Sequence, residues 1–227
     1  MKINISGIEK KIDLENNINV LEIEDKNFIK KFITELNYII NNNIESENII
    51  LEEENNILKF SNNAMIIFDI FNIDFNSKTI LNKLYNKTNE LVKLDDKVET
   101  EYKELIQKLI IYITDKLNEL PFEYDLNDDI IFKDLLKTFS VKINADNYYL
   151  PEEKIMFLID LVSEFKITNI LIFINIKNYF EKSNLEEIYK YAMYKEIKLL
   201  LIENNTTNEI LKYENKLYKY TSINNRF

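Results

Sequence analysis

Hydrophobic positions in the first third of the chain alternate between strand-like and helix-like spacing. Residues 2–14, "KINISGIEKKIDL", predict a hairpin that turns near Gly7, and "NVLEIED", 19–25, predicts a strand. In "KNFIKKFITELNYIINN", 26–42, apolar residues recur every three or four positions, which predicts an amphipathic helix. Two or three more strands are expected within 48–69, the last of them in the apolar run "AMIIFD".

The spacing is helical almost throughout from about residue 76 to residue 139. Asn76 and Ser77 form a cap-like start for one helix. The stretch "VETEYKELIQKLIIYITDKLNEL" predicts a long helix with an apolar stripe that runs from Tyr102 to Leu120. Pro121 is expected to end this helix, and a shorter one is expected near 129–138.

Strands and helices alternate again after this helical block. Pro151 suits the first turn of a helix, and Ser183 with Glu186 matches a capping box. The expected strands are 140–144, 170–176, 198–204 and 216–223, and the expected helices are 151–166, 183–195 and 207–213. The order predicts an α/β fold with a mostly parallel sheet. The α/β domain comprises residues 1–69 and 140–227, and an all-helical domain, 70–139, is inserted into it.

Composition narrows the chemistry that is open to this fold. The chain has 227 residues, of which 46% are hydrophobic and 30% charged, enough for a sizeable core. No signal-like segment and no apolar run of membrane length occurs, so we expect a soluble, cytoplasmic protein with no membrane partner. Cys and His are both absent, which excludes thiol and imidazole catalysis, disulfides and the usual zinc sites. Any metal would be a hard cation held by oxygen atoms.

Glycine is nearly absent, and this argues against a nucleotide site. Gly7 is the one glycine of the sequence, so neither a phosphate loop nor a dinucleotide-binding loop can be built. The strand at 170–176 opens instead into Lys177, Asn178 and Tyr179. The run "MIIFD" has the shape of a Walker B strand, but without a phosphate loop Asp69 is interpreted as a strand-end residue. We expect no bound nucleotide.

Lysines are the candidate contacts for an anionic partner. The net charge of −10 argues against nucleic-acid binding by the whole surface, but it leaves room for a local lysine-lined channel. Lys30 and Lys31 lie near the start of one expected helix. Lys78, Lys83 and Lys87 lie in the inserted domain, where the last two share a helical face. From the sequence alone, an ordinary solvated face is the favoured explanation for all of them.

Two acidic patterns are candidate metal sites. Glu119, Glu123, Asp125 and Asp128 cluster around one helix-to-helix turn, where flexible oxygen ligands suit Ca²⁺. Spacing alone favours a solvated loop, with Asn127 or Asp128 as a helix cap. Elsewhere, Glu196 and Lys198 match the [DE]-x-K element of Mg²⁺-dependent nucleases, with Asp69 as a further acid, although so short a pattern arises often by chance.

The order of several short segments resembles the Csn2 family, the adaptation proteins of type II-A CRISPR systems. The segments are "VLEIEDKNFIKKF" (20–32), "FDIFNIDFNSKTIL" (68–81), "NELPFEYDLNDD" (118–129), "ILIFIN" (170–175), "LLLIE" (199–203) and "YKYTSI" (218–223). None of them is a catalytic motif.

The resemblance implies a fold and a function. It implies a P-loop-NTPase-like head without its phosphate loop, a helical leg inserted into the head, and a ring-shaped homotetramer. It also implies a lysine-lined hole that takes the ends of double-stranded DNA, Ca²⁺ that supports the ring, and a non-enzymatic role in spacer acquisition. The implied partners are the CRISPR integrase proteins and the RNA-guided effector nuclease.

The resemblance also assigns roles to residues. Lys30 falls on a family lysine, and Glu123 and Asp125 fall on the family's acidic calcium segment, where Glu119 and Asp128 would assist. Pro121 and Phe122 depart from that segment, where another acid is common. Two alternatives stay open: a metal-dependent nuclease that uses Glu196 and Lys198, and a degenerate NTPase scaffold that binds only proteins.

Overall fold

The computed structural model describes the chain in two compact units. It describes residues 1–8, 10–15, 17–54, 56–206, 209–214 and 216–220. Unit 1 is formed by Met1–Asp74 and Asp146–Phe227, and unit 2 by Phe75–Ala145. The inserted domain that the sequence predicts at 70–139 corresponds to unit 2.

Unit 1 is built on a five-stranded sheet in which every neighbouring pair is parallel. The strands, in spatial order, are β6 (Ala64–Ile67), β7 (Ile170–Ile174), β8 (Lys198–Glu203), β3 (Ile18–Ile23) and β9 (Lys216–Tyr220). All six residues of β3 are buried, as expected of a parallel strand covered on both faces. The predicted α/β class and parallel sheet are therefore confirmed.

A second, antiparallel sheet precedes and follows β3 in the chain. Its spatial order is β2 (Ile12–Asp13), β1 (Lys2–Ile5), β4 (Ile49–Glu53) and β5 (Asn56–Leu58). Gly7, at φ 87°, lies in the β1–β2 connection, so the predicted hairpin is confirmed. The strands expected in 48–69 also exist, but they divide between the two sheets, and β6 alone joins the parallel one.

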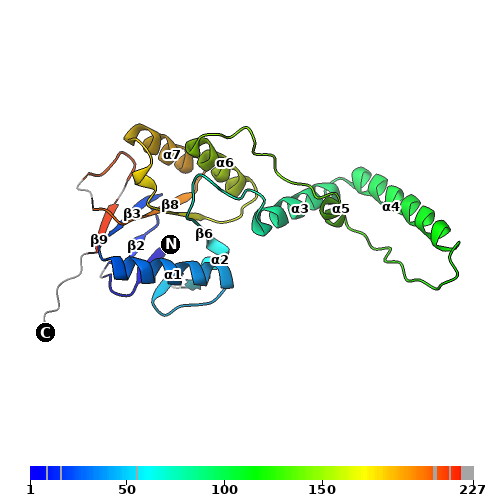
Figure 1. Cartoon of the computed structure of the whole chain (residues 1–227), viewed down its shortest axis with the longest axis horizontal. Coiled ribbons are helices and arrows are strands. Elements are labelled where there is room, and N and C mark those ends of the chain that lie inside the picture. The colour runs from blue at the N-terminus through cyan, green and yellow to red at the C-terminus, as the bar shows by residue number, and fades with distance from the viewer. Residues whose placement is uncertain (9, 16, 55, 207–208, 215, 221–227) are drawn as a thin grey trace. The chain divides into compact units, whose positions relative to one another are not determined.

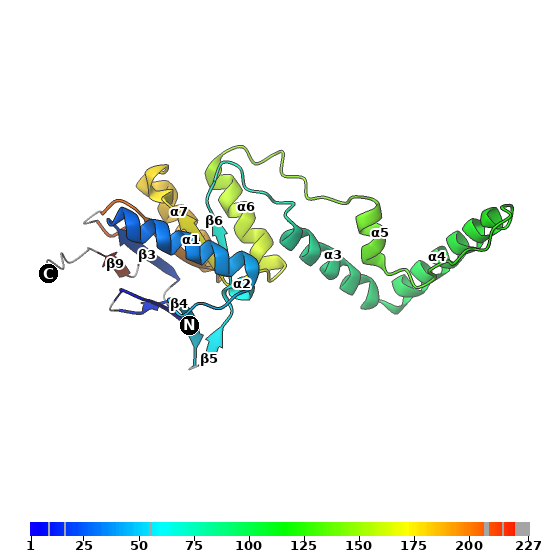
Figure 2. The same cartoon turned by 60° about the horizontal axis from the view of Figure 1, so that its bottom comes forward.

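Helices cover the parallel sheet on both faces. Figure 1 shows α1 (Lys26–Asn42) on one side, and α6 (Pro151–Glu164) and α7 (Lys182–Tyr194) on the other. The four-residue α2 (Phe60–Asn63) lies beside α1 near β5 (Figure 2). The bounds predicted for α1 are those observed.

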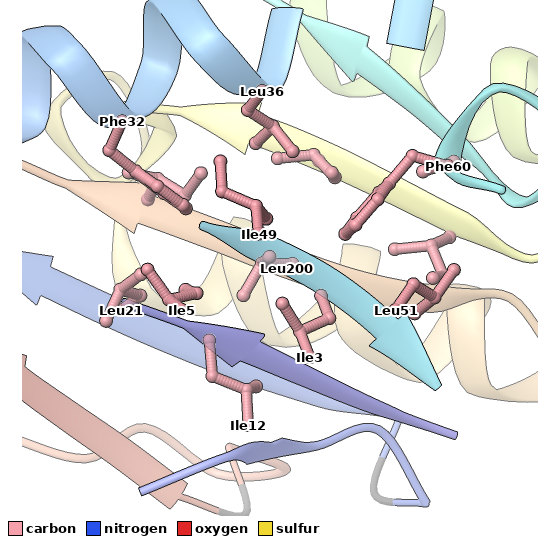
Figure 3. Packing of buried hydrophobic residues seen from close by; sticks show 14 of the residues in the cluster. Ile3, Ile5, Ile12, Leu21, Phe32, Leu36, Ile49, Leu51, Phe60 and Leu200 are labelled. Atoms are coloured by element: carbon pink, nitrogen blue, oxygen red, sulfur yellow. The ribbon is translucent and has the colours of Figure 1, made fainter. Parts of the chain in front are cut away.

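The core of unit 1 lies between α1 and the two sheets. Phe32 and Leu36 of α1 point toward Ile49, Ile5 and Leu200 (Figure 3). These five side chains are at most 4% exposed, so the apolar stripe that predicted the helix is the face it buries. One face of the parallel sheet is thereby closed off, and its opposite face is left to α6 and α7.

Unit 2 contains three helices and an extended return segment. The helices are α3 (Lys78–Lys93), α4 (Asp96–Leu117) and α5 (Phe132–Thr138). The Tyr102 hydroxyl of α4 donates to the carbonyl oxygen of Ile130 at 2.7 Å, and its ring meets Phe132 edge-on. The Tyr85 hydroxyl of α3 donates to the carbonyl of Val141 at 2.7 Å. Tyrosine hydroxyls thus bond the segments before and after α5 to α4 and α3, respectively.

Several local predictions were wrong. No strand forms at 140–144, because this stretch bonds to side chains of α3 and its flank instead of to a neighbouring strand. Neither Ser77 nor Ser183 caps a helix through its side chain. α4 ends at Leu117, before Pro121, and Ile106 is its buried residue, whereas Leu109 and Leu120 are exposed. Of the helix expected at 207–213, residues 207 and 208 lie outside the described residues, and 209–214 form no helix but a turn at 212–213. Of the strand expected at 216–223, residues 216–220 form β9, and 221–223 lie outside the described residues.

Four helices end at a residue in the left-handed region that is not glycine. Asn43, Ser140, Lys166 and Glu196, which follow α1, α5, α6 and α7, have φ between 47° and 58°. This conformation normally favours glycine at helix ends. The chain with one glycine uses other side chains there.

Replacing Asn76 with alanine should loosen the return segment of unit 2. The Asn76 side chain donates to the carbonyl of Ile143 at 3.1 Å and accepts from its N–H at 2.8 Å. Loss of both bonds should cost about 1–2 kcal/mol locally. Hydrogen exchange at Ile143 should then accelerate about tenfold. Asn118→Ala, which removes an exposed bond to the Tyr124 hydroxyl, should leave Ile143 unchanged; equal effects would contradict the assignment.

Candidate functional site

The carboxyl ends of β3 and β8 form the topological switch point of the parallel sheet. These strands are neighbours, and the chain leaves β3 toward α1 on one face but leaves β8 toward α7 on the other. Open α/β sheets bind ligands in the crevice at such a point. It is the place at which the fold itself predicts a site.

Two carboxyl side chains occupy this switch point. Glu22 and Glu203 are partners in the parallel register, and they are 1% and 2% exposed. Because neighbouring side chains alternate between faces, and Leu21, Leu200 and Ile202 face α1, both glutamates lie on the α6–α7 face. An anionic ligand would meet two buried acids here.

Lys177, Glu214 and Tyr189 complete the buried cluster. The Lys177 ammonium lies 2.7 Å from a carboxylate oxygen of Glu214, with exposed side-chain fractions of 13% and 1%. The Tyr189 hydroxyl donates to the same oxygen at 3.0 Å, and the Lys177 backbone N–H donates to Glu203 at 3.1 Å. The five residues Glu22, Lys177, Tyr189, Glu203 and Glu214 are called the switch-point cluster below.

The environment of the cluster moves two pKa values. Burial raises the pKa of Glu203 to about 7; the carboxylates of Glu22 and Glu214 also raise it, while the Lys177 N–H and ammonium oppose the rise. Burial, and then the charge of Glu214, raises the pKa of the Tyr189 phenol far above its usual range. Glu203 is thus a carboxyl group that titrates near neutral pH.

Carboxylates of the chain also occupy two nearby helix N-termini. Asp25 caps α1 by accepting from the N–H groups of Asn27 and Phe28 at 2.8 and 3.0 Å. Glu153 accepts from the N–H groups of Tyr149 and Leu150 at the start of α6, and these bonds lower its pKa. In phosphate-binding α/β proteins such N–H groups bind the ligand. Here they bind side chains of the chain itself.

The proposed nuclease residues are not brought together. Glu196 and Lys198 lie at the amino end of β8, and Asp69 lies beyond the carboxyl end of β6. The register aligns Lys198 with Ile170 and Ile170 with Ala64, so Asp69 lies about 16 Å further along the strand direction. Asp69 instead accepts bonds from Asn72, whose side chain is the main cause of its lowered pKa, and from the Phe71 N–H. One metal ion cannot be shared across that distance.

The two lysines of α1 lie together on an open groove. Lys30 and Lys31 are exposed and line a groove of about 810 Å³ with Asn27, Thr34 and Asn37. In the part of the chain that the structure describes, neither ammonium group pairs with a carboxylate. Amide and hydroxyl groups beside unpaired ammonium groups are the side chains that contact phosphates in nucleic-acid interfaces.

The lysines of α3 form a separate set in unit 2. Lys78, Lys83 and Lys87 are all exposed. Lys83 and Lys87 lie one turn apart on the same face, as the spacing predicted. The five candidate lysines are therefore divided between two units, each with its own local pair.

The acidic turn does not form a metal site within one chain. Glu119, Glu123, Asp125 and Asp128 are exposed along the extended segment after α4, and Glu119 pairs with Lys116 at 2.7 Å. Asn127 accepts from the Asp129 N–H. Among the described residues, no three acidic side chains are grouped closely enough to hold a metal ion. These four residues alone do not fit a calcium site.

Sequence reasoning missed the switch-point cluster. A signal was present: "VLEIED" and "LLLIEN" each place one glutamate at the end of a run of buried strand residues. Because both strands are parallel and adjacent, these glutamates are forced to meet.

Within the described residues, no helix combines the length and apolar character needed to cross a bilayer.

Comparisons with known proteins place the chain among CRISPR-associated proteins. The model of the family described as CRISPR-associated protein (Cas_Csn2) matches residues 41–216. A curated relative, the CRISPR-associated protein Csn2 of Streptococcus agalactiae, is 24% identical over 223 residues, covering 94% of this chain and 93% of the relative.

Two solved structures also match in part. They are a nucleotide-free ATP-binding cassette of an ABC transporter and the ADP conformation of another such cassette, with TM-scores of 0.45 and 0.44. Each is 12% identical, and the match covers 96% of this chain and 87% of the other. The α/β class rests on the strand order of the chain itself.

Proposed function

The chain belongs to the Cas_Csn2 family of CRISPR-associated proteins, and from this premise we propose that it binds the ends of double-stranded DNA during CRISPR adaptation. The family membership supports a role in adaptation. In the proposed mechanism the protein acts without catalysis and without sequence preference, as a homotetrameric ring of the type II-A systems.

The lysine pair on α1 carries this proposal. Lys30 and Lys31 lie side by side on an open groove that is also lined by amide side chains and by one acid, Glu35, although the whole chain has a net charge of −10. A ring would bring four copies of the pair together, which concentrates positive charge in an otherwise acidic assembly. Lysine contacts to phosphate oxygens carry no base information, so binding would be independent of sequence.

The switch point supports a role in which the α/β unit serves as a frame. Its crevice holds buried glutamates, and the adjacent helix N-termini bind Asp25 and Glu153. Both features repel phosphate groups, so nucleotide chemistry at this edge is disfavoured. A metal-dependent nuclease is disfavoured as well, because Asp69 lies far from Glu196 and Lys198.

Unit 2 offers apolar surface for self-association. On α4, Leu105, Ile111 and Tyr112 are 60–65% exposed. Exposed side chains of this kind are common at subunit contacts. Contacts with the integrase proteins and the RNA-guided nuclease stay predictions.

Calcium binding also stays a prediction. Glu119, Glu123, Asp125 and Asp128 supply the hard oxygen ligands that Ca²⁺ prefers, but one chain does not gather them. Ca²⁺ titration by calorimetry, with the four acids replaced by the corresponding amides as the control, tests whether this segment binds the ion at all.

Binding to one duplex in linear and covalently closed circular form tests the proposal. At low salt we expect nanomolar-to-micromolar binding to the linear duplex and at least tenfold weaker binding to the circle, because a closed ring admits DNA only through its ends. Both forms are measured with Ca²⁺ and with a chelator, alongside the mass of the protein in solution.

Each other outcome contradicts a named part of the proposal. Equal binding to both forms would mean an open surface and no ring. A monomeric mass across micromolar concentrations would contradict the proposed tetramer. No affinity for either form would favour the alternative of a scaffold that binds only proteins.

A further inference from the structure

The described residues that follow β8, 204–206 and 209–214, bond to α7 and to the switch-point cluster. We call them the closing segment. The Asn204 N–H donates to the Asn175 side chain at 2.9 Å, and the Lys212 N–H donates to Glu186 of α7 at 3.2 Å. This segment leads into β9, which pairs with β3. One residue of this segment, Glu214, belongs to the cluster.

The closing segment reaches the cluster through Glu214. One oxygen of this carboxylate accepts from Lys177 and Tyr189, and the other accepts from the Leu211 N–H at 3.1 Å. Glu214 is thus bonded both to the sheet side and to its own segment. If it moved outward, Lys177 would lose its carboxylate partner.

Glu203 is the cluster member whose charge opposes closure. It faces Glu22 from β3, Lys177 from η1 (Ile176–Asn178), Glu214 from the closing segment and Tyr189 from α7. Together with Glu203 itself, these described groups comprise three carboxylic acids and one ammonium group, all in a site shielded from water. If all three acids were ionised there, burial and mutual repulsion would raise the free energy of the closed state. One bound proton, which neutralises one of the acids, would remove that cost.

We propose that the switch-point cluster is a proton-dependent latch that holds the closing segment on the sheet. With Glu203 protonated, the segment is closed, and the Lys177 ammonium group pairs with the Glu214 carboxylate alone. With Glu203 ionised, the buried carboxylates repel one another, and the segment opens more often. The proposal goes beyond DNA binding and does not depend on it.

The pH window follows from the direction of the Glu203 shift. The pKa of Glu203 is about 7 in the closed state and, in water, would return to the value of about 4.3 that is usual for glutamate. The closed state therefore binds the proton more tightly. Closure is favoured as the pH falls through 7, and the advantage is lost as the pH rises through it.

Hydrogen exchange of the full-length chain at pH 6 and pH 8 tests the latch. After correction for the intrinsic pH dependence of exchange, amides of the closing segment, Leu211 among them, should be about tenfold less protected at pH 8. Glu203→Gln keeps the shape and removes the titration, so its protection should be equal at the two pH values. Glu209→Gln, an exposed acid of the same segment, should keep the tenfold difference.

Contrary outcomes are clear-cut. Equal protection of the unaltered chain at pH 6 and 8 overturns the latch, as does a tenfold difference that persists in Glu203→Gln. If Glu203→Gln does not fold, Glu22→Gln replaces it, because the Glu22 carboxylate raises the Glu203 pKa. The midpoint of the protection change should then move to lower pH, and an unmoved midpoint rejects the proposal.

Discussion

Replacing Lys177 with methionine should lower the free energy of unfolding by about 3 kcal/mol. Lys177 and Glu214 form a pair at 2.7 Å in which the carboxylate side chain is 1% exposed. Removal of one partner leaves the other charge buried and uncompensated, which typically costs 3–5 kcal/mol. Denaturant unfolding at pH 7.5, followed by circular dichroism, measures the loss as a shift of the midpoint.

Lys182→Met is the matched control for this change. Lys182 pairs with Glu209 at 2.6 Å, but both side chains are more than half exposed. Exposed pairs contribute little, so the control should lose less than about 1 kcal/mol. Similar losses in the two variants would show that burial of the Lys177–Glu214 pair has no special cost. The double variant Lys177→Met/Glu214→Leu should regain much of the stability, because it removes both charges of the pair together.

Reversing the charge of both α1 lysines should weaken DNA binding about 10- to 100-fold. In Lys30→Glu/Lys31→Glu, attraction to phosphate becomes repulsion at a groove that lacks other cations among the residues that line it. The loss should be uniform across sequences, because lysine contacts carry no base information. Fluorescence anisotropy with a linear duplex over a range of salt concentrations measures both the affinity and its salt dependence. The salt slope should become shallower by about 0.9 for each phosphate contact removed.

Lys190→Glu makes half the change of net charge of the α1 variant and tests whether charge reversal at another site also weakens binding. Lys190 is exposed on α7, on the face of the parallel sheet opposite α1 (Figure 1). Its reversal should change affinity less than threefold. If Lys190→Glu weakens binding as much as the α1 variant does, the groove is not the interface. Unchanged binding in Lys30→Glu/Lys31→Glu would exclude the α1 lysines directly.

The elements of unit 1 could be predicted wherever one strong pattern decided them. Helix 26–42 was correct because its apolar stripe, its Asp25 cap and its polar face all agree. The strand at 170–176 was correct apart from its last two residues. Its β-branched run leaves few alternatives once helices flank it.

The errors arose where local patterns competed with distant partners. Residues 140–144 alternate like a strand, yet Asn76 and Tyr85 bind their backbone from far along the chain. Ser183 and Glu186 have capping-box spacing, but Glu186 accepts from the Lys212 N–H instead. Neither partner is visible in a short window of sequence.

The candidate lysines and the buried glutamates show the same contrast between local patterns and distant partners. Lys30 and Lys31 are adjacent in sequence, so their grouping could be anticipated from charge alone. Glu22 and Glu203 end two strands that are far apart in the sequence, and they meet only because β3 and β8 are neighbours. Strand order is a property of the whole fold, so the two strand runs that each end in a glutamate did not by themselves show that these glutamates meet.

The left-handed helix ends show what a shortage of glycine costs this fold. Glycine codons begin with two guanines, whereas asparagine, lysine and isoleucine codons can be written almost entirely with A and T. Asn43, Ser140, Lys166 and Glu196 hold a conformation that costs roughly 1 kcal/mol in a residue with a Cβ atom. Mutational pressure toward A and T can thus be recorded as backbone strain at helix ends. The same fold encoded in a balanced genome would be free to place glycine at each of these positions and relax it.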